Sequence, residues 1–173
     1  MKVSELKKYI RDIPDFPKEG IIFKDISTLL KDPKAFGKSI DALAKQFKKA
    51  RVEYVVGIEA RGFIFGAALA YKLKAGFVPV RKKGKLPYKT KKVTYQLEYG
   101  TDTLEIHEDA VPPKARVLIV DDLLATGGTV KAVIDLLKGQ QAKIVGVAFL
   151  VELEFLKGKE KLKDFPIYSV IQY

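Results

Sequence analysis

The pattern of hydrophobic and polar residues predicts strands that alternate with helices along most of the chain. Short apolar runs, typical of buried strands, occupy residues 54–58, 76–80, 117–120, 143–153 and 167–171. Apolar residues spaced three or four positions apart predict helices at 3–13, 33–50, 63–73 and 130–139. This alternation favours a parallel sheet covered by helices, which is an α/β fold.

The N-terminal region departs from this alternation. Two prolines and a glycine interrupt residues 13–26, which are otherwise rich in apolar side chains. Such a segment is expected to lie over the core, so we predict that residues 1–35 form a small hood or lid.

A second departure begins at residue 81. Residues 81–92 contain seven cations, the composition of a solvated and mobile loop that could also close over a pyrophosphate. Residues 93–99 and 101–106 alternate in character around Gly100 and predict a hairpin arm. We therefore expect residues 81–106 to form a flexible flap on a single domain that spans residues 1–173.

Composition narrows the class of protein. The 173 residues are 47% hydrophobic, and no apolar run approaches the roughly 18 residues of a membrane helix. The N-terminus is charged and lacks the apolar core of a signal peptide, so a cytoplasmic protein without a membrane partner is expected. The chain has no cysteine and one histidine, His107, which we interpret as a surface residue.

The net charge of +11 raises the possibility of nucleic-acid binding. Only five of the 32 basic residues are arginine, and the lysines are spread along the chain as on a solvated surface. A positive field also attracts polyphosphate substrates, so no nucleic-acid partner is expected.

Residues 117–129 carry the clearest chemical pattern. Two carboxylates, Asp121 and Asp122, are expected just after the strand at 117–120, where they could bind sugar hydroxyls or Mg²⁺. The small-residue turn that follows offers backbone N–H groups and hydroxyls to an anion at the start of a helix, from Ala125, Thr126, Gly127, Gly128 and Thr129. A phosphate site beside a diol site describes a ribose 5-phosphate.

A second motif, Glu59-Ala60-Arg61-Gly62, follows the predicted strand at 54–58. Ligands of parallel sheets bind outside the carboxyl ends of the strands, which places this motif near the first. Arg61 could hold two phosphate oxygens, and Gly62 allows close backbone approach. The alternative is an arginine that only caps its own turn.

Together these motifs resemble the adenine phosphoribosyltransferases of the type I phosphoribosyltransferase family. Residues 117–129 resemble that family's signature for phosphoribosyl pyrophosphate (PRPP). The adenine group is indicated by motifs at 14–17, 20–26, 59–63, 81–87 and 97–100. The resemblance runs from about Val3 to Tyr173 and implies a central, mainly parallel twisted sheet flanked by helices, with a hood and a flap.

The resemblance also implies an activity. The 5-phosphoribosyl group of PRPP would be transferred to adenine, giving AMP and pyrophosphate in purine salvage. The enzyme would be a homodimer that uses Mg²⁺. The metal would be held mainly through PRPP, with Asp121 or Asp122 as a further contact through water.

Roles for individual residues follow from the same resemblance. The 5′-phosphate would be bound by residues 125–129 and the ribose by Asp121 and Asp122. The pyrophosphate would be bound by Glu59, Ala60, Arg61, Gly62, Arg81, Lys85 and Tyr99, and in this family the loop at 59–62 often has a strained or cis peptide. Adenine would be bound by Ile22, Phe23, Lys24 and Leu153, and the catalytic residues would be Glu98 and Arg61. The family usually has arginine where this chain has Lys24. A contact made by the backbone would survive that difference, but a contact made by a planar guanidinium would not.

Two other hypotheses remain open at this point. The PRPP signature also fits a guanine, xanthine or orotate enzyme, although the N-terminal segment and the pair Glu98-Tyr99 weigh against it. The charge of +11 also fits a nucleic-acid-binding regulator that uses the fold as a PRPP sensor. The sequence shows no helix-turn-helix appendage that would support this second alternative.

Overall fold

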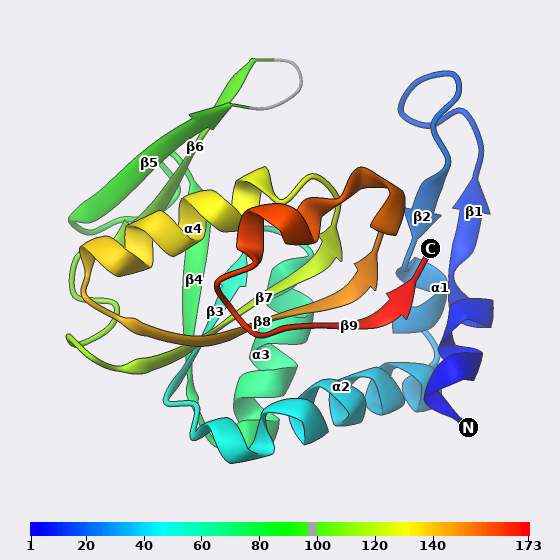
Figure 1. Cartoon of the computed structure of the whole chain (residues 1–173), viewed down its shortest axis with the longest axis horizontal. Coiled ribbons are helices and arrows are strands. Elements are labelled where there is room, and N and C mark those ends of the chain that lie inside the picture. The colour runs from blue at the N-terminus through cyan, green and yellow to red at the C-terminus, as the bar shows by residue number, and fades with distance from the viewer. Residues whose placement is uncertain (97–99) are drawn as a thin grey trace.

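The computed structural model describes residues 1–96 and 100–173, and in them the strands form two sheets (Figure 1). The smaller sheet pairs β1 (Arg11–Ile13) with β2 (Phe23–Asp25). The larger sheet has seven strands in the order β5-β6-β4-β3-β7-β8-β9. Their bounds are β3 (Tyr54–Ile58), β4 (Gly76–Lys82), β5 (Thr90–Gln96), β6 (Thr101–His107), β7 (Arg116–Leu124), β8 (Lys143–Glu152) and β9 (Ile167–Gln172).

The large sheet is mainly parallel, as the sequence predicts. Strands β4, β3, β7, β8 and β9 are parallel neighbours, whereas β6 and β5 continue the sheet antiparallel. From β3 the chain crosses first to β4 on one side and later to β7 on the other. This reversal creates a crevice at the carboxyl ends of β3 and β7, where parallel sheets bind ligands.

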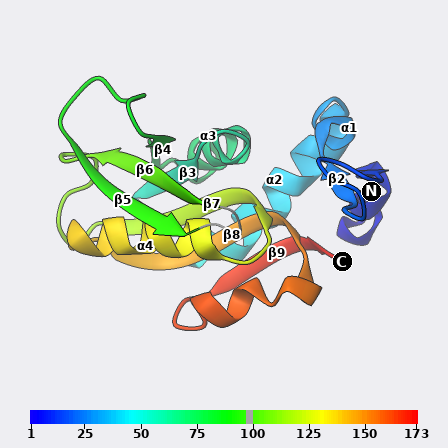
Figure 2. The same cartoon turned by 90° about the horizontal axis from the view of Figure 1, so that it is seen from above.

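Helices cover both faces of this sheet (Figure 2). Helices α2 (Pro33–Phe47) and α3 (Gly62–Leu73) lie on one face, and α4 (Gly128–Gly139) lies on the other. The central strand β7 is apolar on both sides, because Leu118 and Val120 pack with α2 and α3 while Val117 and Ile119 pack with α4. No helix in the described part of the chain is long and apolar enough to cross a membrane.

The first helix is shorter than the sequence predicts. A 3-10 helix, η1 (Val3–Tyr9), is followed by β1, so the expectation of one helix over 3–13 is wrong. Cross-strand ion pairs favour the strand: Arg11 lies opposite Asp25, and the Lys24 ammonium is 2.8 Å from Asp12. These partners are distant in sequence, so the local apolar spacing did not reveal them. Three short 3-10 helices occur later, η2 (Lys48–Ala50), η3 (Glu154–Leu156) and η4 (Gly158–Leu162).

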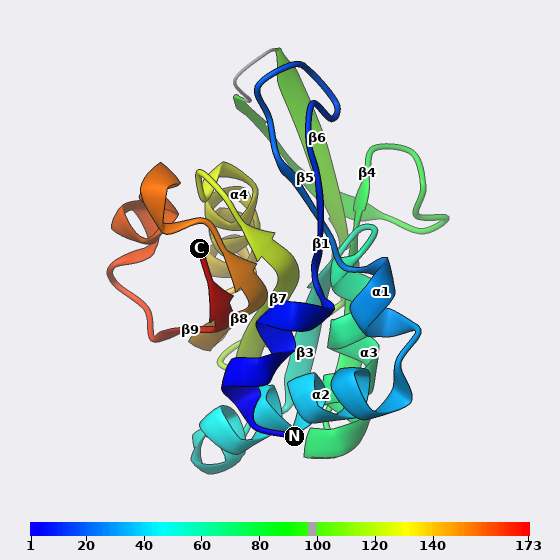
Figure 3. The same cartoon turned by 90° about the vertical axis from the view of Figure 1, so that its right-hand side faces the viewer.

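The cationic segment is more ordered than its composition suggests. Strand β4 continues to Lys82 and β5 begins at Thr90, so part of the expected loop at 81–92 is strand. Val93 and Tyr95 pack against the core and give β5 an apolar side. The arm of β5 and β6 and the loop between β1 and β2 extend from the same end of the molecule (Figure 3).

His107 is half-buried, which corrects its interpretation as a surface residue. Its ring meets Tyr88 edge to face with centroids 6.0 Å apart. Its carbonyl oxygen accepts a hydrogen bond of 2.7 Å from Gln140, the residue after α4. His107 therefore lies at the base of the arm, where its ring packs against Tyr88.

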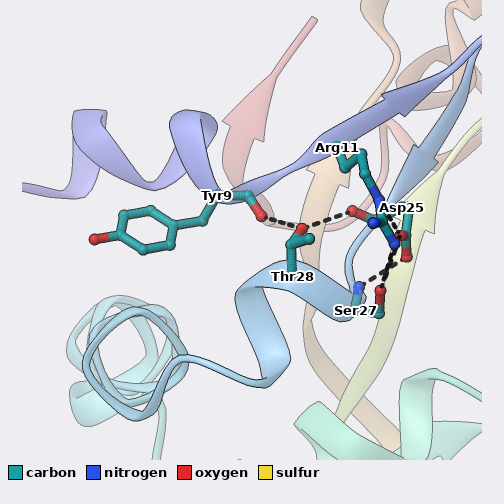
Figure 4. A network of polar contacts seen from close by, with 5 residues as sticks. All are labelled: Tyr9, Arg11, Asp25, Ser27 and Thr28. Carbon is teal, nitrogen blue, oxygen red and sulfur yellow. Dashed lines mark hydrogen bonds and ion pairs between the residues drawn. The ribbon is translucent and has the colours of Figure 1, made fainter.

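Within the hood, a polar network joins β1 and β2 to the short helix α1 (Ser27–Leu30) (Figure 4). Asp25 accepts hydrogen bonds from the Ser27 N–H (2.9 Å), from Arg11 (2.6 Å) and from the Ser27 hydroxyl (2.8 Å). The Thr28 hydroxyl donates to the Tyr9 carbonyl oxygen at 2.6 Å. The hydrogen bonds to Asp25, that from the Ser27 N–H first, lower its pKa from 3.8 to about 2.

This network predicts a pH-dependent contribution to stability. Because the pKa of Asp25 is lower in the folded chain, its stabilisation is complete above about pH 4 and is lost as pH falls towards 2. We expect Asp25→Asn to lower the free energy of unfolding at pH 7 by about 1–2 kcal/mol. The variant should also show a weaker pH dependence between pH 4 and 2 in urea titrations. Asp164→Asn, at an exposed position, is the control, and equal pH slopes in both variants would contradict the prediction.

Candidate functional site

A cavity of about 360 Å³ lies at the carboxyl ends of β3 and β7. It is lined by Ile58, Glu59, Ala60, Arg61, Lys82, Tyr95, Asp102, Leu104, Asp121, Asp122 and Thr129. Both motifs singled out in the sequence therefore meet in one cavity, at the crevice that the strand order creates.

The two aspartates lie inside β7 and not after it, which corrects the expected position. Pairing between β3 and β7 ends at Gly57 and Val120, whereas β8 accompanies β7 as far as Leu124. Strand β7 consequently extends past the end of β3. This extension carries Asp121 and Asp122 to the wall of the cavity.

The environment of this pair raises the pKa of both carboxyl groups. Burial is the main cause for each, and the charge of Asp122 raises the pKa of Asp121 further. The Asp122 N–H donates to Asp121 Oδ1 at 2.8 Å, and Arg61 Nε lies 2.9 Å from Asp122 Oδ2. These few contacts leave carboxylate oxygens available to hydroxyl groups or to a cation.

Glu59 also lines the cavity but has a different environment. Its carboxylate lies 2.8 Å from the Lys85 ammonium and 3.4 Å from the Arg81 guanidinium, and it accepts the Lys82 N–H at 2.9 Å. Burial alone would raise the pKa of Glu59, but these three donors lower it to about 2. Glu59 thus stays ionised and holds two cations that the resemblance assigns to pyrophosphate.

Gly62 brings the two motifs into contact. A Cβ atom at this position would lie 2.9 Å from both Asp121 Oδ1 and the Val120 carbonyl oxygen, so only glycine fits. Helix α3 begins at Gly62, one residue earlier than predicted. The Glu59–Ala60 peptide is cis, as the resemblance implied.

The turn between β7 and α4 encloses a small cavity whose backbone could bind an anion. Residues 123–130 and Asp121 surround a cavity of about 70 Å³. Gly127 has a φ of +78°, and α4 starts at Gly128 with its free N–H groups facing the turn. The Thr129 hydroxyl lies 3.3 Å from the Tyr95 hydroxyl, which joins the arm to this turn.

The residues expected to bind adenine belong to the hood and to the end of β8. Ile22 is 55% exposed, and the Phe23 ring has Phe16 at 5.2 Å between centroids. The guanidinium carbon of Arg61 also lies 5.2 Å from the Phe23 centroid, which connects the hood to the cavity. Leu153 follows β8, and its N–H donates to the Leu124 carbonyl oxygen at 2.9 Å.

The Lys24 side chain has one partner in the hood and one at the C-terminus. Its ammonium pairs with Asp12 at 2.8 Å and lies 4.0 Å from the centroid of the Tyr173 ring. The side chain is therefore engaged, and the backbone of Lys24 is the part that a base could contact.

Some cavity residues were missed by sequence reasoning. Lys82 pairs with Asp102 at 3.1 Å, and Tyr95 stands opposite Asp102 in the ladder of β5 and β6. Counting outward from Gly100 would pair residue 102 with residue 98, so the pairing of Tyr95 with Asp102 could not be read from the sequence. Glu98 and Tyr99, by contrast, were predicted as site residues and lie outside the described residues.

The acidic groups of the site fit a metal held mostly by its ligand. Within residues 1–96 and 100–173, no group of three or more histidine, cysteine, aspartate or glutamate side chains could hold a metal by itself. Asp121 and Asp122 supply two carboxylates, and Mg²⁺ commonly binds one or two carboxylates together with substrate phosphates. This donor set matches Mg²⁺ bound mainly through a polyphosphate.

Comparisons with known proteins agree with this geometry. Residues 26–172 match the family described as the phosphoribosyl transferase domain. An adenine phosphoribosyltransferase from Acidobacterium capsulatum is 58% identical over 97% of this chain and 93% of its own length. The chain belongs to the adenine phosphoribosyltransferase family. The family that the sequence motifs indicated is thereby confirmed.

Solved structures of adenine phosphoribosyltransferases confirm the type I fold. The enzyme from Thermoanaerobacter pseudethanolicus superimposes with a TM-score of 0.96 at 53% identity, covering 99% of this chain and 100% of its own. The enzyme from Saccharomyces cerevisiae was solved with adenine and an imino-altritol bisphosphate. It superimposes with a TM-score of 0.92 at 44% identity, and the match covers 96% of each chain.

Proposed function

We propose that this chain transfers the 5-phosphoribosyl group of PRPP to adenine, giving AMP and pyrophosphate in purine salvage. The observation that carries the proposal is the order of groups along the site. The anion-binding turn, the aspartate pair and the cation cluster around Glu59 follow one another. PRPP carries a 5-phosphate, a diol and a pyrophosphate in the same order.

Each part of PRPP has a matching set of residues. Residues 125–129 bind the 5′-phosphate through the N–H groups at the start of α4 and the threonine hydroxyls. Asp121 and Asp122 accept hydrogen bonds from the ribose hydroxyls. Burial raises the pKa of both carboxyl groups, and hydrogen bonds donated by the ribose hydroxyls would favour their charged forms.

The pyrophosphate lies against residues 59–62 with Arg81 and Lys85 beside it. Breaking the bond from C1′ to the pyrophosphate oxygen leaves a cation-like sugar and concentrates negative charge on the leaving group. Arg61, Arg81 and Lys85 stabilise that charge, and Glu59 holds two of them in position beforehand. Mg²⁺, when bound, would offset further charge on the pyrophosphate, with Asp121 or Asp122 reaching it through water.

Adenine binds between Phe23 and Leu153, where the backbone of Ile22 and Lys24 reads its edge. The exposed position of Ile22 leaves that backbone accessible. Because Asp12 and Tyr173 engage the Lys24 ammonium, base recognition does not depend on whether residue 24 is lysine or arginine.

The proposal predicts which base is consumed. With PRPP and Mg²⁺, adenine should yield AMP and pyrophosphate, while hypoxanthine, guanine, xanthine and orotate should not react at comparable rates. Lys24→Met, which matches the side chain in length, should keep this order of bases because the contact is made by the backbone. Preferred turnover of another base would contradict the proposed base pocket, and binding of PRPP without turnover would favour the regulator hypothesis.

The family resemblance also assigns roles to Glu98 and Tyr99. Tyr99 would lie on the flap near the pyrophosphate. Glu98 would accept the proton that adenine N9 loses, or steady the purine, while the closed flap excludes water.

Replacing Glu98 tests this role. Glu98→Gln removes the proton acceptor but keeps a similar shape, so we expect kcat to fall about 10²- to 10⁴-fold. The circular dichroism spectrum and the unfolding temperature should match those of the unaltered chain. Near-normal turnover would remove Glu98 from the mechanism.

We further propose a homodimer formed through α3. This helix is apolar on nearly every side, a pattern typical of a fully covered helix. Yet Ile64 and Tyr71, two turns apart on α3, are 40% and 89% exposed, and the nearby Phe77 on β4 is also exposed. A second copy of the chain would cover this face. We also propose that the dimer is cytoplasmic and has no nucleic-acid or membrane partner.

A charge on this face should disrupt the dimer. Sedimentation velocity should give the mass of two chains for the unaltered protein and of one chain for Tyr71→Glu, because the carboxylate would be buried unpaired. Phe155→Glu, at an exposed aromatic residue on η3, serves as the control and should remain dimeric. A dimeric Tyr71→Glu variant would place the interface elsewhere.

A further inference from the structure

The segment that follows β8 lies directly against the anion-binding turn. Helix η4 packs beside the start of α4 (Figures 1 and 3). A Cβ atom on Gly158 would overlap the Ala125 carbonyl oxygen and lie 2.9 Å from the Leu124 side chain. A Cβ atom on Gly127 would lie 2.7 Å from the Gly158 carbonyl oxygen. Two glycines thus allow the two backbones to touch.

An ion pair anchors the same segment. The Lys159 ammonium lies 2.7 Å from Glu152 Oε2. Glu152 is the last residue of β8, and its side chain is only 4% exposed, whereas that of Lys159 is 40% exposed. Removal of Lys159 would leave a buried carboxylate without its cation, which strongly disfavours the present arrangement.

The other contacts of this segment hold its two ends. Leu162, the last residue of η4, is fully buried among the residues that pack under α4. At the start, the Leu153 N–H is bonded to Leu124, the last residue of β7. Between these fixed ends, the Gly158 backbone lies against Ala125 and Gly127, and the ion pair of the next residue, Lys159, ties this segment to the end of β8.

We infer that Gly158 and Lys159 are positioning residues that set the shape of the 5′-phosphate site. This inference rests on the proposed function, in which residues 125–129 bind the 5′-phosphate. Backbone N–H groups bind an anion well only when they converge on it, and displacement by about 1 Å can reduce function about 10²-fold. The Gly158 backbone is in close contact with Ala125 and Gly127 of the turn, so a displacement of η4 would displace the turn as well.

The test separates affinity for PRPP from the other kinetic constants. Lys159→Met keeps the length of the side chain and removes its charge, so KM for PRPP should rise about 10- to 100-fold. The KM for adenine and kcat at saturating PRPP should stay close to those of the unaltered enzyme. Lys159→Arg restores the cation and should restore most of the affinity for PRPP. Gly158→Ala should also raise KM for PRPP, provided that it folds.

Two comparisons decide the outcome. Lys161→Met, at an exposed lysine of the same helix, should leave all constants unchanged. Equal changes in both KM values and kcat for Lys159→Met, or a failure of Lys159→Arg to restore affinity, would indicate general structural damage and overturn the inference.

A variant within the turn distinguishes the inference from the function it rests on. If Thr126→Val raises KM for PRPP while Lys159→Met does not, the turn binds phosphate but η4 does not position it. If neither variant alters KM for PRPP, the assignment of the 5′-phosphate site is wrong, and the positioning role falls with it.

Discussion

The close contact between Gly62 and β7 determines the arrangement of the site. Strands β3 and β7 are parallel neighbours, but their pairing stops at Gly57 and Val120. Beyond that point, the missing side chain of Gly62 lets the loop after β3 rest on the Val120 carbonyl and on Asp121. Arg61 thereby reaches Asp122, and α3 starts beside the carboxylates. Any larger residue would separate the loop from the aspartates by roughly the width of a methyl group, enough to part groups that must act on one ligand.

The acidic residues of the cavity fall into two sets whose pKa values are shifted in opposite directions. Glu59 is saturated with donors from Lys85, Lys82 and Arg81, so its pKa is low and its role is to hold cations. Asp121 and Asp122 are buried beside one another with fewer donors, so their pKa values are raised. Glu59 already has its hydrogen-bond donors within the protein, whereas Asp121 and Asp122 gain most from a ligand that brings hydroxyls or a cation. This contrast supports the proposed division of the cavity, with the preorganised cations facing the leaving group and the two aspartates facing the sugar.

The sequence could predict what depends on local pattern and missed what depends on distant partners. Strands such as 117–120 were identifiable because burial on both faces demands a continuous apolar run. The turn at 125–129 was identifiable because glycines and hydroxyls suit an anion. The end of the first helix at Tyr9 was not, since the strand after it is stabilised by residues 24 and 25. Lys82 and Asp102 were missed for a similar reason, because their pairing needs the register between β4 and β6.

Segments without a recognisable motif hold the motif residues in place. The centroid of the Tyr173 ring lies 4.0 Å from both the Lys7 and the Lys24 ammonium groups, so the two ends of the chain fix β2, the strand that we propose contacts adenine. The arm reaches the phosphate turn through Tyr95 and Thr129, and η4 supports that turn from behind. Each substrate group thus depends on a tertiary contact between segments far apart in the sequence. On the proposed assignments, an exchange such as lysine for arginine at residue 24 should leave recognition intact, because the side chain is engaged elsewhere, whereas a change at a residue that touches no ligand should weaken it when that residue holds a binding segment in place.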